Sequence, residues 1–386
     1  MNNKNPLNTK RLLIVTYGNP IENPGPAMLA WELKKRLDQN QNIFFLGTYN
    51  SSPPENCGYG ETYFKIQNFK EDPGPLGKIY QRYFHIGYTF FLLRKIKSCR
   101  VNIVNFHNLG MAIPLLVFPL LRLMNIKTIA TFHDYTNVYN RKLYPSDLQA
   151  QQTKDLRSLV TRIMNGIVLK TNRIMFKFAS NIVYLSTDQK KIYTRFRFPD
   201  GAVIENKIED CRCEYFDNGS KVKPNIVFIG RRIGKGLDSL IDWIGNQEVF
   251  QLTLVGSEDL AQIAQTRLPR HKFEFLGKLP PKEVYLAIHN STLLYAVSDC
   301  LDVYPTTVLE AIVHGIPVLV SRNCGNHHLV SEINPSFIID GIAEFTPSEL
   351  LKMLETWNGK KRTLSKVSYI CDFSQQIVAY EKLLRE

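Results

Sequence analysis

The sequence predicts an α/β protein made of two doubly wound, Rossmann-like domains with parallel sheets. Three observations predict it: the length, the composition and a repeated alternation of strand and helix patterns. The chain has 386 residues, of which 44% are hydrophobic and 22% are charged, an ordinary globular composition. At about 100–200 residues per domain, two domains are expected. Domains of that size can bury a full core without disulfides.

The first half alternates short apolar runs with helical patterns, as chains with parallel sheets and crossover helices do. The expected strands are residues 11–17, 42–46, 101–106, 127–132, 181–185 and 202–204. The expected helices are residues 26–37, 76–98, 109–124 and 155–179.

The second half repeats this alternation. The expected strands are residues 225–230, 250–256, 272–277, 292–297 and 316–321. The expected helices are residues 237–246, 258–266, 281–289, 306–314 and 346–357. A polar stretch at 201–217 separates the halves, so we expect domains at 1–205 and 206–365, with a last amphipathic helix within 366–386.

The formal net charge of +13 is unevenly distributed. Residues 1–205 hold 28 Lys and Arg against 13 Asp and Glu, whereas residues 206–386 hold 20 against 22. Such asymmetry indicates that one domain faces an anionic partner. A membrane lipid or a phosphorylated substrate is favoured over nucleic acid, because no nucleic-acid-binding motif accompanies the charge.

Three segments of the first half mix cations with aromatic or apolar residues: 76–100, 159–180 and 190–198. Helices of this kind suit the interface of an anionic bilayer. The alternative is that the aromatic side chains form core and the cations form a solvated face. For 76–100 the sequence leaves both open.

The cellular location is expected to be the cytoplasm. The polar N-terminus lacks the apolar core of a secretory signal, and no run reaches the roughly 18–20 apolar residues that a spanning helix needs. Seven cysteines, an odd number, fit a reducing compartment. Cys211 and Cys213 form an isolated C-x-C, from which we expect no metal site.

One strand-to-helix turn, residues 230–236, can hold an anion. It resembles a Walker A run but is one residue short and ends in Gly, which excludes a P-loop NTPase. Backbone N–H groups and the positive helix end favour an anion there. Arg231 and Lys235 add two cations, enough to hold a diphosphate without metal. A basic surface turn is the alternative, but the position at a strand's carboxyl end favours a binding site.

Two carboxylates follow a later strand. Asp302 lies in the loop after strand 292–297, and Glu310 lies in the first turns of the next helix. One of them can reach an open cleft while the other accepts hydrogen bonds from a ribose diol. The helix dipole alone also favours carboxylates at this position. No G-x-G-x-x-G follows any strand, which disfavours a nicotinamide dinucleotide enzyme.

These motifs together resemble the C-terminal half of the retaining family 4 glycosyltransferases (glycosyl transferases group 1). The resemblance covers residues 225–330: Gly-Arg…Lys-Gly, an acidic residue and Glu310 separated by seven positions, then Glu-Ala…Gly-x-Pro-Val. VNIVNFHN, TIATFHD and VIENKIE resemble family segments more loosely. The resemblance implies the GT-B fold, in which two Rossmann-like domains face a central cleft and a terminal helix crosses back to the N-terminal domain.

The resemblance also implies roles for individual residues. Arg231 and Lys235 would neutralise the donor diphosphate and its leaving-group charge, and Glu310 would bind the ribose hydroxyls. Asp302 would lie beside the donor sugar, and His133 would contact that sugar from the facing domain. No metal or other cofactor is implied. The remaining residues expected to bind the donor are Gly25, Thr306 and Thr307.

The sequence departs from the family pattern at four points. Asp302 stands where Glu is usual, and the spacing from Arg231 to Lys235 is one residue short. Gly25 is a single glycine between prolines, and His328 stands where Glu is usual. His107 and His133 both follow strands and have structural histidines as the alternative reading. Asp134 is expected to orient or cap its loop.

We therefore expect a retaining glycosyltransferase that moves a hexosyl group from a UDP- or GDP-linked sugar to a glycolipid or polysaccharide intermediate. It would be peripheral on the inner face of the membrane and attracted to anionic lipid. The alternatives are a catalytically weak GT-B scaffold or binding protein, and a sugar-nucleotide epimerase of the same fold.

Overall fold

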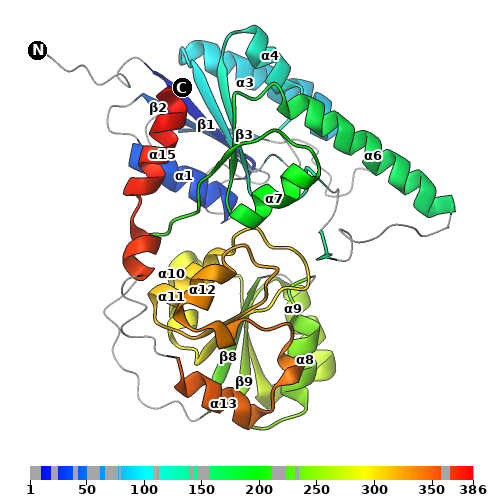
Figure 1. Cartoon of the computed structure of the whole chain (residues 1–386), viewed down its shortest axis with the longest axis vertical. Helices are drawn as coiled ribbons and strands as arrows, with labels where there is room; N and C mark the ends of the chain where they lie inside the picture. The colour runs from blue at the N-terminus through cyan, green and yellow to red at the C-terminus, as the bar shows by residue number, and fades with distance from the viewer. Residues whose placement is uncertain are drawn as a thin grey trace, which may run out of the picture. The chain divides into compact units, whose positions relative to one another are not determined.

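The computed structural model describes residues 10–18, 25–37, 42–49, 61–65, 77, 80–107, 109, 113–138, 143–145, 156–210, 223–230, 234–357 and 366–385. The chain forms two compact units. The first unit comprises Met1–Arg141, Ala150–Asn206 and Phe373–Glu386, and the second comprises Lys142–Gln149 and Lys207–Asp372. Each unit holds one sheet (Figure 1).

The sheet of the first unit has seven strands in the order β3-β2-β1-β4-β5-β6-β7, and every neighbouring pair is parallel. The strands are β1 (Leu12–Thr16), β2 (Ile43–Tyr49), β3 (Glu61–Lys65), β4 (Ile103–His107), β5 (Lys127–Phe132), β6 (Asn181–Tyr184) and β7 (Ala202–Val203). Because Thr16 pairs with His107 and His107 with Thr131, the carboxyl ends of β1, β4 and β5 reach the same edge.

Helices of the first unit are α1 (Pro26–Leu37), α3 (Ile86–Ser98), α4 (Val117–Leu123), α6 (Leu156–Phe176), α7 (Thr187–Arg195) and α15 (Ser374–Arg385). α15, the last helix of the chain, contacts α1 (Figure 1). Tyr380 and Leu384 of α15 join one buried cluster with Leu33 of α1 and Ile14 of β1. Burial of each large apolar side chain contributes about 1.5–3 kcal/mol, so α15 is an integral part of the first unit.

The sheet of the second unit has five parallel strands in the order β10-β9-β8-β11-β12. They are β8 (Asn225–Gly230), β9 (Gln251–Gly256), β10 (Phe273–Gly277), β11 (Leu293–Ala296) and β12 (Val318–Val320). The helices are α8 (Leu237–Gly245), α9 (Glu258–Arg267), α10 (Pro281–His289), α11 (Thr306–Val313), α12 (His327–Ile333) and α13 (Pro347–Glu355). The predicted α/β class with two doubly wound parallel sheets is thereby confirmed. Both sheets reverse their strand order once, at β1/β4 and at β8/β11, which is where such sheets bind ligands.

The expected helix over residues 76–98 is interrupted. Tyr80–Phe84 forms a short π-helical turn, and α3 begins only at Ile86. His85 separates the two, and its Nδ1 accepts a hydrogen bond from the backbone N–H of Tyr88 at 3.2 Å, which caps α3. The turn directs the side chain of Arg82 into the core, where it donates to the backbone oxygen of Thr136 at 3.0 Å.

Other local expectations need correction. The helix expected over 109–124 is only Val117–Leu123 within the described residues, because Pro114 lacks an N–H and disfavours helix at the residue before it. β3 and α12 were not expected, since neither has a strong apolar pattern.

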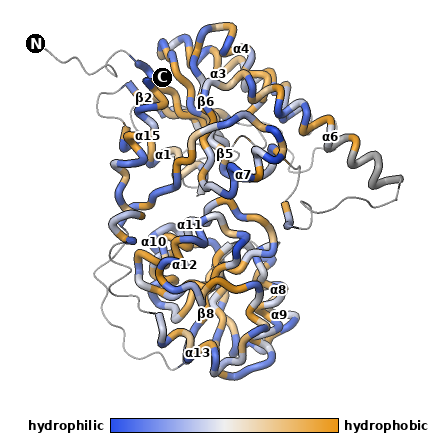
Figure 2. Tube along the Cα trace, viewed as in Figure 1, coloured by the Kyte–Doolittle hydropathy of each residue, from blue (hydrophilic) through white to orange (hydrophobic). Residues whose placement is uncertain are grey.

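Figure 2 shows the hydropathy of each described residue along the chain. β8 is a hydrophobic segment, whereas the coloured part of α6 alternates between hydrophobic and hydrophilic residues. Among the helices described, none combines the length and the apolar character needed to cross a bilayer.

Candidate functional site

Two loops at the carboxyl edge of the second sheet are joined by hydrogen bonds. One is the turn after β8, and the other is the loop after β11. The hydroxyl of Ser298 and the backbone N–H of Cys300 both donate to the carbonyl oxygen of Gly234, at 2.8 and 3.1 Å. The N–H of Gly236 donates to Oδ2 of Asp299 at 3.1 Å. These bonds therefore fix the backbones of the two loops relative to each other.

Glycine is required at position 236. Its φ of +69° is left-handed, and a Cβ atom there would lie 2.3 Å from the carbonyl oxygen of Val297. A side chain would push the turn away from the loop after β11. Gly236 thus permits the close approach on which the joined loops depend.

Lys235 and Asp302 project from these two loops and form an ion pair with each other. Their side chains are 30% and 19% exposed. Burial alone would lower the pKa of Lys235, but the attraction and hydrogen bond of Asp302 outweigh it and raise that pKa above its ordinary value. Lys235 therefore stays fully protonated at neutral pH. Arg231, the other expected cation, lies outside the described residues.

Glu310 lies in the second turn of α11, which begins with Thr306 and Thr307. Its Oε2 atom is shielded from solvent and has no hydrogen-bond partner within the described part of the chain. Burial raises the pKa of Glu310 to about 7, although a hydrogen bond from Thr306 opposes this. A shielded carboxylate oxygen without a partner costs free energy, and a ligand hydroxyl could satisfy it.

A third loop, after β12, is bonded to the same region. The N–H of Asp302 donates to the carbonyl oxygen of Asn323 at 2.9 Å, and the N–H of Gly325 donates to the carbonyl oxygen of Asp302 at 2.8 Å. The side chain of Asn323 also donates to the carbonyl oxygen of Ser298 at 2.7 Å. These bonds fix the backbone of Asp302 from both sides. Sequence reasoning missed Asn323, although its place after a strand's carboxyl end was a usable signal.

His328, which stands at a departure from the family pattern, lies in the first turn of α12. This helix follows the loop after β12, so His328 belongs to the same edge of the sheet as Asp302.

In the first unit, His107 and His133 lie side by side at the carboxyl ends of β4 and β5. Nδ1 of His107 and Nε2 of His133 are 2.9 Å apart. Burial lowers the pKa of His133 to about 3 and that of His107 well below its ordinary value. Both rings are therefore neutral at pH 7, so His133 can exchange hydrogen bonds but carries no positive charge.

Two further sequence-predicted residues lie near the same edge of the first sheet. Gly25 immediately precedes α1 with a φ of +105°, and a Cβ there would meet open space. Asp134 accepts from the N–H and the hydroxyl of Thr136, at 2.9 and 2.6 Å, which is the orienting role expected for it. Neither arrangement by itself identifies a ligand.

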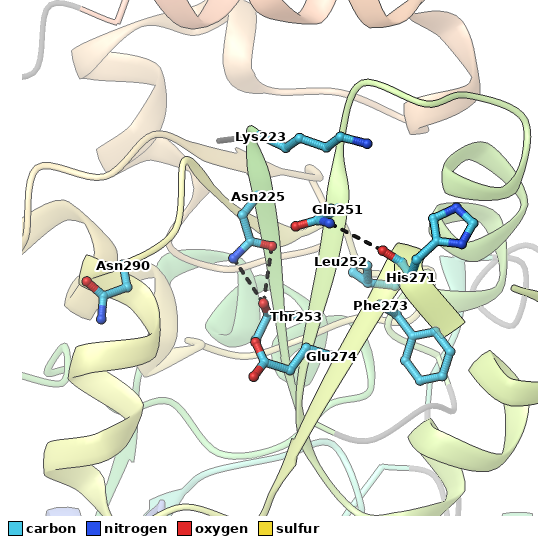
Figure 3. A pocket seen from close by; sticks show the side chains of 9 residues that line it. All are labelled: Lys223, Asn225, Gln251, Leu252, Thr253, His271, Phe273, Glu274 and Asn290. Carbon is cyan, nitrogen blue, oxygen red and sulfur yellow. Dashed lines mark hydrogen bonds between the residues drawn. The ribbon is translucent and has the colours of Figure 1, made fainter. Parts of the chain in front are cut away.

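A separate hollow of about 400 Å³ lies at the amino ends of β8 and β9 (Figure 3). Asn225 and Thr253 hydrogen-bond each other inside it, and Gln251 donates to the carbonyl oxygen of His271. Lys235, Asp302 and Glu310 follow the carboxyl ends of strands, so this hollow is not part of the candidate site.

Among the described residues, no group of three His, Cys, Asp or Glu side chains is arranged to hold a metal ion. Cys211 and Cys213 lie outside the described residues.

Solved structures of similar architecture are glycosyltransferases and related synthases. Sucrose-phosphate synthase from Thermosynechococcus elongatus matches with a TM-score of 0.72 and 13% identity, covering 97% of this chain and 98% of that one. HepE from Anabaena, solved with UDP and glucose, matches with a TM-score of 0.66 and 13% identity, covering 97% of this chain and 99% of that one. WaaG, a glycosyltransferase involved in lipopolysaccharide biosynthesis, matches with a TM-score of 0.65 and 15% identity, covering 96% of this chain and 98% of that one. The chain thus has the GT-B fold.

Residues 214–352 match the family model of glycosyl transferases group 1. The matched segment contains Lys235, Asp302 and Glu310. The second unit therefore carries a glycosyl transferases group 1 domain, and the protein is a glycosyltransferase. No curated protein sequence matches the chain.

Gly236→Ala should destabilise the protein by more than about 2 kcal/mol, because left-handed strain adds to the clash with Val297. Gly315→Ala is the matched control: its φ is +72°, but a Cβ there meets open space, so only strain of about 1–2 kcal/mol applies. Chemical denaturation measures both. Equal losses in the two variants would contradict the close approach at Gly236.

Proposed function

We propose that the protein transfers a hexosyl group, with retention and without metal, from a UDP- or GDP-linked sugar to a glycolipid or polysaccharide intermediate. The observation that carries the proposal is the set Lys235, Asp302 and Glu310 on loops bonded together at the carboxyl edge of a group 1 domain. Crystals of HepE with UDP-glucose support a uridine nucleotide as the first donor to test.

The donor nucleotide matches the chemistry of the second unit. Lys235 supplies a positive charge for the diphosphate, and the start of α8 follows it directly, adding the positive end of a helix dipole. Arg231 would add a second cation. The partnerless oxygen of Glu310 can accept a hydrogen bond from a ribose hydroxyl, and Thr306 and Thr307 offer hydroxyls at the start of α11.

The chemical step breaks the bond between the anomeric carbon and the phosphate oxygen. The transition state has oxocarbenium character, and the electron pair of the broken bond stays on the β-phosphate. A cation placed there in advance stabilises charge where it develops, which is the role of Lys235. The acceptor oxygen attacks from the face that the phosphate leaves, and its proton passes to the departing phosphate oxygen. Neutral His133 would exchange hydrogen bonds with the sugar.

The surface of the first unit supports an acceptor at an anionic membrane. Residues 73–133 contain no Asp or Glu. Phe90 on α3 is 73% exposed and Leu123 on α4 is 84% exposed. A hollow of about 600 Å³ between α3 and the end of α4 includes Phe90 and Met124 together with Arg94, Lys97 and Arg100. Exposed apolar side chains beside cations suit peripheral binding to anionic lipid.

Glu310→Gln should weaken donor binding and stabilise the nucleotide-free protein. The variant loses a charged acceptor for ribose, which should raise the KM for the donor about tenfold or more. Because burial raises the pKa of Glu310 to about 7, the native state binds more protons than the unfolded chain from about pH 4.5 to 7. Stability is therefore lost as pH rises through that range. Glu310→Gln avoids this loss. Its free energy of unfolding should exceed that of wild type by about 1–3 kcal/mol at pH 8 and by almost nothing at pH 4.

Melting curves at pH 4 and pH 8, together with transfer assays, measure both effects. Glu344→Gln, at an exposed glutamate, is the control and should change neither. A Glu310→Gln variant with unaltered donor KM would contradict the assignment of ribose binding.

Membrane binding should require the cations of the hollow. Each cation near an anionic membrane surface contributes about 1 kcal/mol to binding. Replacing Arg94, Lys97 and Arg100 with Gln should therefore reduce flotation with phosphatidylglycerol-containing vesicles at least tenfold. The matched control replaces three exposed cations of the second unit, Arg270, Lys278 and Lys282. Binding should weaken with salt, and equal flotation by both triple variants would contradict the proposal.

A further inference from the structure

The cation expected to bind the diphosphate already has an anionic partner. Nζ of Lys235 contacts Oδ2 of Asp302, although the sequence assigned the two residues to different parts of the donor. Both side chains are largely buried, and Asp302 raises the pKa of Lys235, so the lysine keeps its positive charge. In the nucleotide-free protein, Asp302 therefore neutralises the charge that the donor needs.

The pair can open without movement of the loops. Backbone bonds to Asn323 and Gly325 hold Asp302 on both sides, and bonds from Ser298 and Cys300 hold Gly234 next to Lys235. Only the side chains of Lys235 and Asp302 remain to move. Lysine has a flexible stem and three donor positions, so it can turn from the carboxylate to a phosphate at little cost.

The two possible ligands leave Asp302 in different states. A nucleoside diphosphate that takes Lys235 leaves a partly buried carboxylate without its cation, which is costly. A nucleotide sugar supplies, in addition, hydroxyl groups that can donate to the freed carboxylate. The intact donor therefore compensates for the lost ion pair, whereas the nucleoside diphosphate product does not.

We infer that Asp302 is a resident counter-ion that the donor diphosphate displaces from Lys235. The displaced carboxylate then accepts hydrogen bonds from the sugar hydroxyls. After transfer the sugar is gone, Asp302 pairs with Lys235 again, and the nucleoside diphosphate is released. The inference rests on the proposed function and adds a role for one residue: Asp302 selects the nucleotide sugar over the nucleoside diphosphate.

Titration calorimetry with UDP and UDP-glucose, and with GDP and GDP-mannose, tests the inference. Asp302→Asn should bind the nucleoside diphosphate about fivefold more tightly than wild type at low salt, and the gain should shrink as salt rises. Its preference for the nucleotide sugar should fall by at least the same factor. Asp242→Asn is the matched control, since Asp242 pairs with Arg267 on the surface, and it should leave both affinities unchanged.

A second readout is independent of ligands. Because Asp302 raises the pKa of Lys235, Asp302→Asn should make that amine react severalfold faster with acetic anhydride at pH 8.5, as measured by mass spectrometry of the Lys235 peptide. This test also applies to wild type with UDP added, where bound nucleotide should protect Lys235.

The outcomes separate the inference from the proposed function. If wild type binds nucleotides but Asp302→Asn binds the nucleoside diphosphate equally or more weakly, the inference fails and the proposed function stands. If wild type binds none of the nucleotides, both are overturned. An unaltered acetylation rate in a folded Asp302→Asn protein would also overturn the inference.

Discussion

A lysine held in a partly buried position must keep a negative partner, and this constraint governs Lys235. In the second unit that partner is Asp302, and under the proposed function the donor diphosphate would compete with it. Removing a charge from water is costly unless another charge compensates for it. Under the inference, one anion would replace another beside Lys235 and the local charge would stay balanced, so a lysine could take the place of a divalent ion at a diphosphate.

The rest of the second unit would support this exchange by fixing the backbone of the loops around Lys235 and Asp302. Gly236 allows the turn after β8 to approach the loop after β11, and Asn323 ties that loop to the one after β12. All three loops leave the carboxyl ends of parallel strands, which is the edge where doubly wound sheets bind ligands. Glu310 adds a shielded carboxylate oxygen without a hydrogen-bond partner among the described residues, to which a ligand hydroxyl could donate.

The fold class and the site's residue types follow from the sequence because apolar runs, turns and motif order are local features. The pairing of Lys235 with Asp302 does not, since 67 positions separate them and only the sheet order brings β8 beside β11. The break at His85 was missed for a similar reason: Arg82 and Tyr83 turn into the core through contacts with distant residues. Burial of His107 and His133, which makes both rings neutral, likewise depends on the packing of β4 against β5.

The most direct measurement is a crystal structure of the protein with a bound nucleotide sugar, grown in the presence of a chelator. The account predicts that Nζ of Lys235 contacts the diphosphate, that Glu310 contacts the ribose, and that Asp302 has turned from Lys235 to a sugar hydroxyl. A nucleotide sugar bound elsewhere on the second unit, or bound there with the Lys235–Asp302 pair intact, would contradict it.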